Sequence, residues 1–152
     1  MKRSIRAAAL LVALAAAAGA QTADEQSIRA LTDQFCKAVV DGDLSGLDKV
    51  FDAGSGNVYY DINEQMIGFS RLRQVWQAAT TNFSITRFEF GPDMRIIVKG
   101  DEAVQVGSWR QTQLSRSGTS RNINGRATIL WKRTPGGWRA YHYHASVTPA
   151  GR

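Results

Sequence analysis

The sequence predicts an α+β domain in which three N-terminal helices pack on one face of a strongly curved, mostly antiparallel sheet. Before residue 83, apolar residues recur every three or four positions in three segments, which is the period of an amphipathic helix. From residue 83 onward they recur every second position, which is the period of a strand. Helices first, followed by long strands with short connections, are typical of helices layered on an antiparallel sheet.

The helical pattern is clearest in Asp24–Val40 and Leu44–Phe51, which are separated by Gly42. A third helix is predicted over Ser70–Thr80, with Ser70 as its candidate N-cap. Between the second and third helices, Val58–Ile62 is rich in residues that favour strands.

Four long segments of the second half predict an antiparallel meander, because turn-forming residues such as Gly, Pro and Asp separate them. The predicted strands are Ile85–Phe90 continuing through Met94–Val98, then Ala103–Leu114, Arg121–Arg133 and Trp138–Val147.

The N-terminus predicts a secretory signal peptide. It has three basic residues within its first six, an apolar run over Ala7–Ala18, and a small-x-small pattern that ends at Ala20. We therefore expect residues 1–20 to be removed and residues 21–152 to form one domain that works in the periplasm or outside the cell. The apolar run is shorter than the ~20 residues that span a bilayer, so no membrane anchor is expected.

Charge is unevenly distributed along the chain. The full sequence has 19 Lys+Arg and 13 Asp+Glu, and without the three cations of the signal the balance is 16 against 13. Residues 21–64 hold nine acids and three bases, whereas residues 103–152 hold eight bases and no acid. Either the two halves attract each other, within or between subunits, or the sheet presents an anion-attracting surface. The modest total charge argues against nucleic acid as a partner, and the single Cys36 is expected to be a packing residue.

The stretch Gly125–Arg139 followed by Tyr141–Ser146 resembles the closing hairpin of SnoaL-like domains, which belong to the nuclear transport factor 2-like superfamily. Asp41–Leu44, Tyr59–Asp61 and Gly68 with Trp76 follow the same order along the chain. This resemblance implies a cone-shaped single domain with a pocket inside the cone. It leaves the function open, because the scaffold hosts isomerases, dehydratases, cyclases and non-catalytic assembly modules.

Within that superfamily, the chain is similar to the association domain of calcium/calmodulin-dependent kinase II at Gly100–Ala103, Arg110–Gln113 and His142–Ser146. That domain has a cavity with three arginines, of which only the one at Arg110 is kept; Ile129 and Ala145 occupy the other two positions. The resemblance implies that Arg110 orients a ligand carboxylate.

A more distant resemblance to ketosteroid isomerases places Asp61 near their general base. Phe35 and Ala127 occupy the positions of their two oxyanion donors, so steroid isomerisation is not expected.

The last predicted strand alternates two histidines with two tyrosines. His142 and His144 share one face, and Tyr141 and Tyr143 share the other, unless a one-residue bulge intervenes. The arginine comparison favours the tyrosine face for the pocket and leaves the histidines for a dimer contact. The histidines are alternatively acid–base groups opposite Asp61, or, least favoured, metal ligands that lack an obvious third partner.

We therefore expect an exported module that dimerises through its sheet and binds a small, partly apolar ligand, with an anionic group on the ligand as a further expectation. The first alternative is a cofactor-free isomerase, dehydratase or other lyase, and the second is a non-catalytic assembly module. No metal or cofactor is expected. The candidate catalytic residues are Asp61, His142 and His144. The candidate ligand-binding residues are Phe35, Tyr59, Trp76, Arg110, Tyr141 and Tyr143.

Overall fold

A computed structural model describes residues 23–62 and 64–148. The expected signal peptide, residues 1–20, lies outside the described residues. The described part begins with a helix over residues 23–41. The elements that follow are α2 (Leu44–Val50), β1 (Val58–Tyr60), β2 (Gln65–Ile67), α3 (Phe69–Asn82), β3 (Phe83–Phe90), β4 (Arg95–Lys99), β5 (Glu102–Ser115), β6 (Ser120–Thr134) and β7 (Gly137–Val147).

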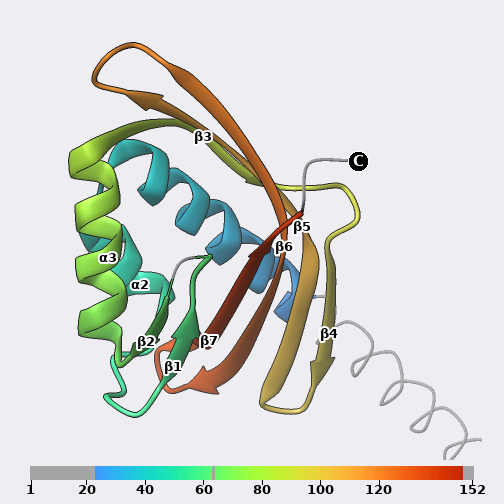
Figure 1. Ribbon diagram of the computed structural model, residues 1–152. Coiled ribbons are helices and arrows are strands. Elements are labelled where there is room, and N and C mark those ends of the chain that lie inside the picture. Colours follow the sequence, from blue (N-terminus) through green and yellow to red (C-terminus); the bar gives the residue numbers. More distant parts are fainter. Residues whose placement is uncertain (1–22, 63, 149–152) are drawn as a thin grey trace, which may run out of the picture.

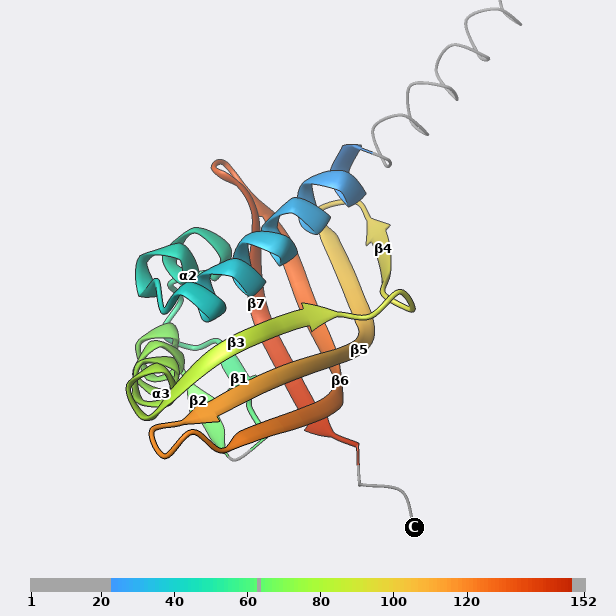
Figure 2. The same ribbon diagram turned by 90° about the horizontal axis from the view of Figure 1, so that it is seen from above.

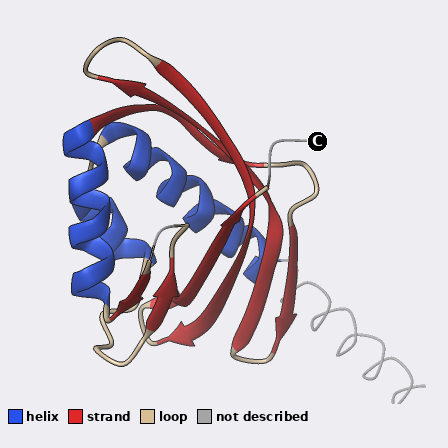
Figure 3. Cartoon of the chain, in the orientation of Figure 1, coloured by secondary structure: helices blue, strands red, loops and turns tan. Residues whose placement is uncertain are grey.

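The strands form a single curved sheet whose concave face carries the helices (Figures 1 and 3). Its order is β2-β1-β7-β6-β5-β3, with β4 also paired to β5. Every strand pair is antiparallel except β1 with β7. Seen from above, the helix of residues 23–41 runs across the sheet while α3 stands at its edge (Figure 2). The predicted α+β cone is confirmed.

The structure differs from the sequence prediction at three points. β2, which pairs with β1, was not predicted because three residues are too few to display a period. The predicted segment Ile85–Val98, with turn residues at Gly91–Asp93, is two strands, β3 and β4, that each pair with β5, and Asp93 fixes the turn between them by accepting hydrogen bonds from Ser108. The N-cap of α3 is Gly68, so the prediction of Ser70 as the cap is wrong.

A bulge in β7 changes which side chains face the helices. Leu130 pairs with His142, but the next residue of β6, Trp131, pairs with Ala140, so Tyr141 is extra. Ala140 and Tyr143 are consequently both buried on the concave face. Tyr141 turns to the convex face, and only Tyr143 keeps the orientation that strict alternation favours for the pocket.

An aromatic cluster holds the helices to the sheet. The ring of Phe35, in the first helix, packs edge-to-face against Phe51, Trp76, Phe88 and Tyr143, with centroids 5.2 to 5.9 Å apart. These partners follow α2 or belong to α3, β3 and β7, so one side chain contacts four separate parts of the fold. Edge-to-face aromatic pairs add about 0.5–1.5 kcal/mol each to the free energy of burial.

The acidic helical half and the basic sheet attract each other within the subunit. Arg133 of β6 pairs with Asp24 at 2.5 Å, and its guanidinium lies 4.6 Å from the centre of the Trp138 ring. Lys132 pairs with Asp52 at 2.8 Å. The structure thus supports the first of the two explanations for the uneven charge.

Among residues 23–62 and 64–148, no helix combines the length and the apolar character needed to cross a bilayer.

Replacing Phe35 by alanine is expected to destabilise the domain by about 3–5 kcal/mol, the usual cost of deleting a buried aromatic ring. Ile67→Ala is the control, because Ile67 is 64% exposed and its loss should cost less than about 0.5 kcal/mol. Urea unfolding monitored by tryptophan fluorescence measures both. Equal effects of the two substitutions would contradict the central role of Phe35.

Candidate functional site

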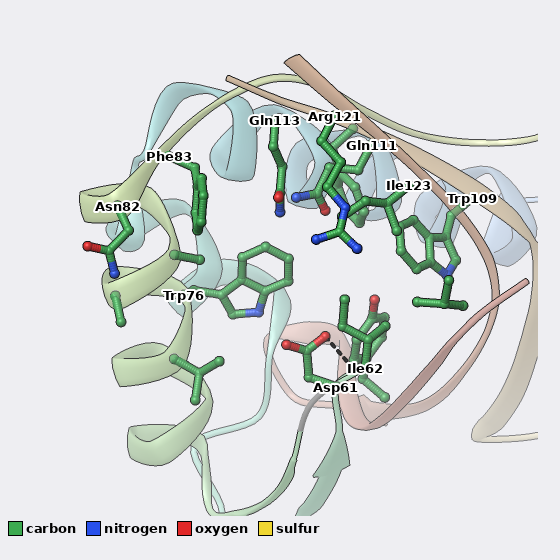
Figure 4. Close-up of a pocket in the computed structure, with 16 residues that line it drawn as sticks. Asp61, Ile62, Trp76, Asn82, Phe83, Trp109, Gln111, Gln113, Arg121 and Ile123 are labelled. Carbon is green, nitrogen blue, oxygen red and sulfur yellow. Dashed lines mark hydrogen bonds between the residues drawn. The ribbon is translucent and has the colours of Figure 1, made fainter. Parts of the chain in front are cut away.

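A cavity of about 460 Å³ lies between α3 and the concave face of the sheet (Figure 4). Its walls are mostly apolar and include Val75, Trp76, Phe88, Trp109, Ile123 and Tyr143. Its polar side chains are Asp61, Asn82, Gln111, Gln113 and Arg121. Three of the wall residues, Trp76, Phe88 and Tyr143, also contact Phe35, so the aromatic cluster forms one end of the cavity.

Gly125 allows Trp109 to form part of the wall. The two residues are direct partners in the β5–β6 pair, and the indole lies against the glycine. A Cβ atom at Gly125 would sit 2.6 Å from Cε2 of Trp109 and would collide with the carbonyl oxygen of Ser146. Any larger residue at this position would therefore displace the wall. The Trp109 indole N–H is buried and has no hydrogen-bond partner in the described part of the chain.

Asp61 brings a carboxyl group to the cavity just beyond the end of β1 (Figure 4). Its backbone N–H donates to the carbonyl of Glu64 at 3.0 Å, and its Oδ1 accepts the backbone N–H of Ile62 at 2.7 Å. Burial raises the pKa of Asp61; the Ile62 hydrogen bond partly opposes this, and the charge of Glu64 adds to it. The group is therefore easier to protonate than an exposed aspartate.

Tyr143 places a buried phenol beside this carboxyl group. Burial raises the pKa of Tyr143 far above its usual range, and the charge of Asp61 contributes a smaller part of the increase. The hydroxyl group is therefore neutral at physiological pH and available as a hydrogen-bond donor.

Arg121 reaches the cavity from the start of β6, and sequence analysis did not single it out. It is the cross-strand partner of Gln113, while Ile123 is the partner of Gln111, and all four side chains line the cavity. The alternation of the strand could have identified it, because Arg121 is an even number of residues from the buried Ile123 and Ala127 and therefore lies on the same face of β6.

The two histidines lie on the opposite face of the sheet from Asp61. His142 Nδ1 is 2.7 Å from the carbonyl oxygen of Val58. The centroids of the His142 and His144 rings are 6.3 and 5.5 Å from that of Tyr60, which is partly exposed. Neither histidine lines the cavity of Asp61, so the structure does not bring together the proposed aspartate–histidine pair.

The remaining candidate residues are distributed over three environments. Arg110 is exposed on the convex face and pairs with Glu89. Tyr141 is also on that face, and the centre of its ring lies 5.8 Å from Nζ of Lys132. Phe35 and Tyr59 are fully buried in the core. Of the candidate residues, only Asp61, Trp76 and Tyr143 line the cavity.

No group of three His, Cys, Asp or Glu side chains in the described residues is arranged to hold a metal ion. Cys36 is half-buried in the first helix, and burial raises the pKa of its thiol to about 12. The thiol is therefore protonated and poorly nucleophilic at neutral pH, consistent with a packing role.

A protein-family model described as a SnoaL-like domain matches residues 28–150. Calcium/calmodulin-dependent protein kinase type II subunit delta from Oryctolagus cuniculus is 24% identical over 136 residues. These residues are 84% of this chain but only 24% of that relative, so the chain spans about a quarter of the kinase's length.

Two solved structures have the same fold. A nuclear transport factor 2-like superfamily protein from Salmonella enterica subsp. enterica serovar Typhimurium str. LT2 superposes with a TM-score of 0.79 and 20% identity, over 86% of this chain and 95% of that chain. A calcium/calmodulin-dependent protein kinase II association domain-like protein from Xanthomonas campestris gives a TM-score of 0.70 and 17% identity, over 82% and 88% of the two chains. At these identities the similarity establishes the fold alone.

Asp61→Asn is expected to stabilise the protein at neutral pH. The folded state raises the pKa of this carboxyl, so wild-type stability falls as pH rises through the folded pKa, and asparagine removes that loss. The melting temperatures of mutant and wild type should converge below about pH 4, where the aspartate is protonated in both states. Thermal unfolding measured from pH 3 to 8 tests this.

Asp93→Asn is the matched control with the opposite sign. Hydrogen bonds from Ser108 lower the pKa of Asp93, so its contribution to stability is present at neutral pH and lost as pH falls through the folded pKa. This variant should be less stable than wild type at pH 7 and equal to it in strong acid. An Asp61→Asn variant that melts below wild type at pH 7 would contradict the assignment of Asp61 as a group that burial penalises.

Proposed function

The chain belongs to the SnoaL-like domain family, and on that premise we propose that it is an exported module whose cone binds a small, partly apolar molecule. The cavity carries the proposal. Its volume of about 460 Å³ falls in the range of small-molecule sites, about 300–1,000 Å³. It also combines aromatic walls with a few polar groups from different elements, as such sites do.

The polar and apolar groups that line the cavity fit a ligand-binding site better than a core that only stabilises the fold. A core that exists only to fold gains most from apolar side chains in contact with one another. Here β5 and β6 direct two amides and a guanidinium toward the carboxyl group of Asp61 across unfilled space (Figure 4). These groups find hydrogen-bond partners when a polar ligand enters.

The convex face supports the proposal of a homodimer. Its register places Ile97, Val104, Leu130 and His142 in one row across four strands. Ile97 is 54% exposed and Val104 38% exposed. Three of the four residues are apolar, and a largely apolar row across a sheet is suited to packing against a second copy of itself. Binding and assembly therefore use opposite faces of the same strands.

Native mass spectrometry of the mature protein from its own host tests export, assembly and binding together. We expect a subunit mass that begins at Gln21, a two-subunit species, and a retained small molecule. A ligand-free monomer would contradict the binding proposal, and a subunit that keeps residues 1–20 would contradict processing of the signal.

Matched variants make the same measurement specific. Ala79→Phe, on α3, adds a ring to the cavity wall and should prevent the protein from retaining the small molecule. Ala30→Phe adds the same ring at an exposed position of the first helix and should preserve it. Val104→Asp should convert the dimer to a monomer without changing the fold, because it places a charge in the apolar row.

A second candidate function is cofactor-free acid–base catalysis, as in an isomerase or lyase. The observation that favours it is the presence of Asp61 and Tyr143 on one cavity. A carboxylate with a raised pKa is a suitable proton acceptor, and a neutral buried phenol can donate a hydrogen bond to a developing oxyanion. The histidines have no part in this version.

For a substrate that the cavity turns over, Asp61→Asn is expected to lower kcat at least 100-fold, within the usual range for loss of a general base. Tyr143→Phe should lower it less, because it removes one donor and no proton acceptor. His144→Ala is the control and should leave kcat unchanged. Full activity of the Asp61→Asn enzyme, with its fold intact, would contradict the assignment of the base.

A further inference from the structure

Arg121, Gln111 and Gln113 form a polar cluster on one wall of the cavity (Figure 4). We propose that this cluster is a carboxylate-recognition site that selects monoanionic ligands with an apolar body. The inference rests on the proposed binding function and deepens it, because it names the class of ligand.

The strand register places the three side chains together. Gln113 and Arg121 are direct cross-strand partners, and Gln111 lies two residues before Gln113 on the same face of β5. Paired side chains on one face of an antiparallel sheet have Cβ atoms about 5 Å apart. Figure 4 shows the Arg121 guanidinium and the two amides directed into the cavity, on the opposite side from Asp61. The cluster therefore presents donors from two strands to one small volume.

The guanidinium of Arg121 is not used by the fold. Within residues 23–62 and 64–148 it has no ion-pair or hydrogen-bond partner. Two other basic residues of β6 are paired, Lys132 with Asp52 and Arg133 with Asp24, whereas Arg126, exposed on the opposite face, has no partner among the described residues either. Unlike Arg126, Arg121 lines the cavity, so its exposed guanidinium can pair with a negatively charged group of a ligand.

Gln111 provides a second, independent observation. The residue is only 7% exposed, and its side-chain amide makes no hydrogen bond to the described residues. Gln105, on the same face of β5, shows how the fold treats a structural glutamine. Its Oε1 accepts hydrogen bonds from Thr32 at 2.8 Å and Trp131 at 3.1 Å. The amide of Gln111, unlike that of Gln105, is therefore free to bond with a group that enters the cavity.

These donors fit a carboxylate better than a neutral or dianionic group. A guanidinium binds a carboxylate through two parallel hydrogen bonds, and amide N–H groups can complete the shell. Arg121 is the one basic residue among the described residues that line the cavity, so it can pair with a single ligand carboxylate. Across the cavity, Asp61 repels any further anion when it is ionised, while Trp76, Phe88 and Ile123 favour an aromatic or aliphatic body.

Arg110, which the resemblance suggested as the anion-binding residue, is not part of this site. That residue pairs with Glu89 on the convex face and does not line the cavity. The two arginines are on different strands and different faces, so substitutions distinguish them.

The test compares two probes of matched shape, 1-naphthaleneacetate and the neutral 1-naphthaleneacetamide, by isothermal titration calorimetry. The wild-type protein should bind the carboxylate about tenfold more tightly or better, the typical effect of a charge-assisted hydrogen bond. Arg121→Met should remove that preference and leave the affinity for the amide unchanged. Gln111→Leu should weaken carboxylate binding severalfold without lowering the melting temperature.

Arg126→Met is the matched control, because Arg126 is on the same strand, is exposed and has the opposite parity. It changes the protein charge equally and should preserve the preference for the carboxylate. Equal binding of both probes to wild type and to Arg121→Met would overturn carboxylate recognition while leaving the cavity as a binding site. If neither probe binds to the wild-type protein, both this inference and the proposed binding function fail.

Discussion

The packing of Phe35 against four other aromatic rings is the contact on which the rest of the structure depends. It joins the first helix to the end of α2, to α3 and to the two strands β3 and β7. Three of its partners, Trp76, Phe88 and Tyr143, turn another edge toward the cavity. The position of these walls is therefore fixed by the core, and a ligand would meet rings already held in one orientation.

The cavity begins where the apolar core stops along β5 and β6. On the concave face of β5, Trp109 is followed by Gln111 and Gln113, and on β6 the inward position next to Ile123 is Arg121. Polar side chains at these positions cannot fill the space under α3 as a well-packed apolar core would. The curvature of the sheet carries them over the cavity, so the change from apolar to polar along two paired strands gives the cavity one polar wall.

The period of apolar residues was sufficient to predict the helices, the long strands and the class of fold. The site was predicted less well, because it depends on register. Arg110 was selected by resemblance, but its parity puts it on the convex face with Glu89. The prediction for Tyr141 was wrong because β7 contains a bulge, which the local sequence pattern does not indicate. Arg121 has the parity of its buried neighbours, yet its place opposite Gln113 follows from the turn that joins β5 to β6.

The sheet separates the two kinds of polar residue that the sequence brings close together on β7. Tyr143 is buried on the concave face, where Asp61 is its neighbour, whereas His144 is exposed on the convex face beside Tyr60. Adjacent residues of a strand point to opposite faces, so a proton cannot pass directly between His144 and the cavity. Any chemistry in the cone must rely on the carboxyl group, the phenol and the polar cluster of Arg121. The histidines are then available to the convex surface that we propose as the dimer interface, so β7 can contribute different residues to each face.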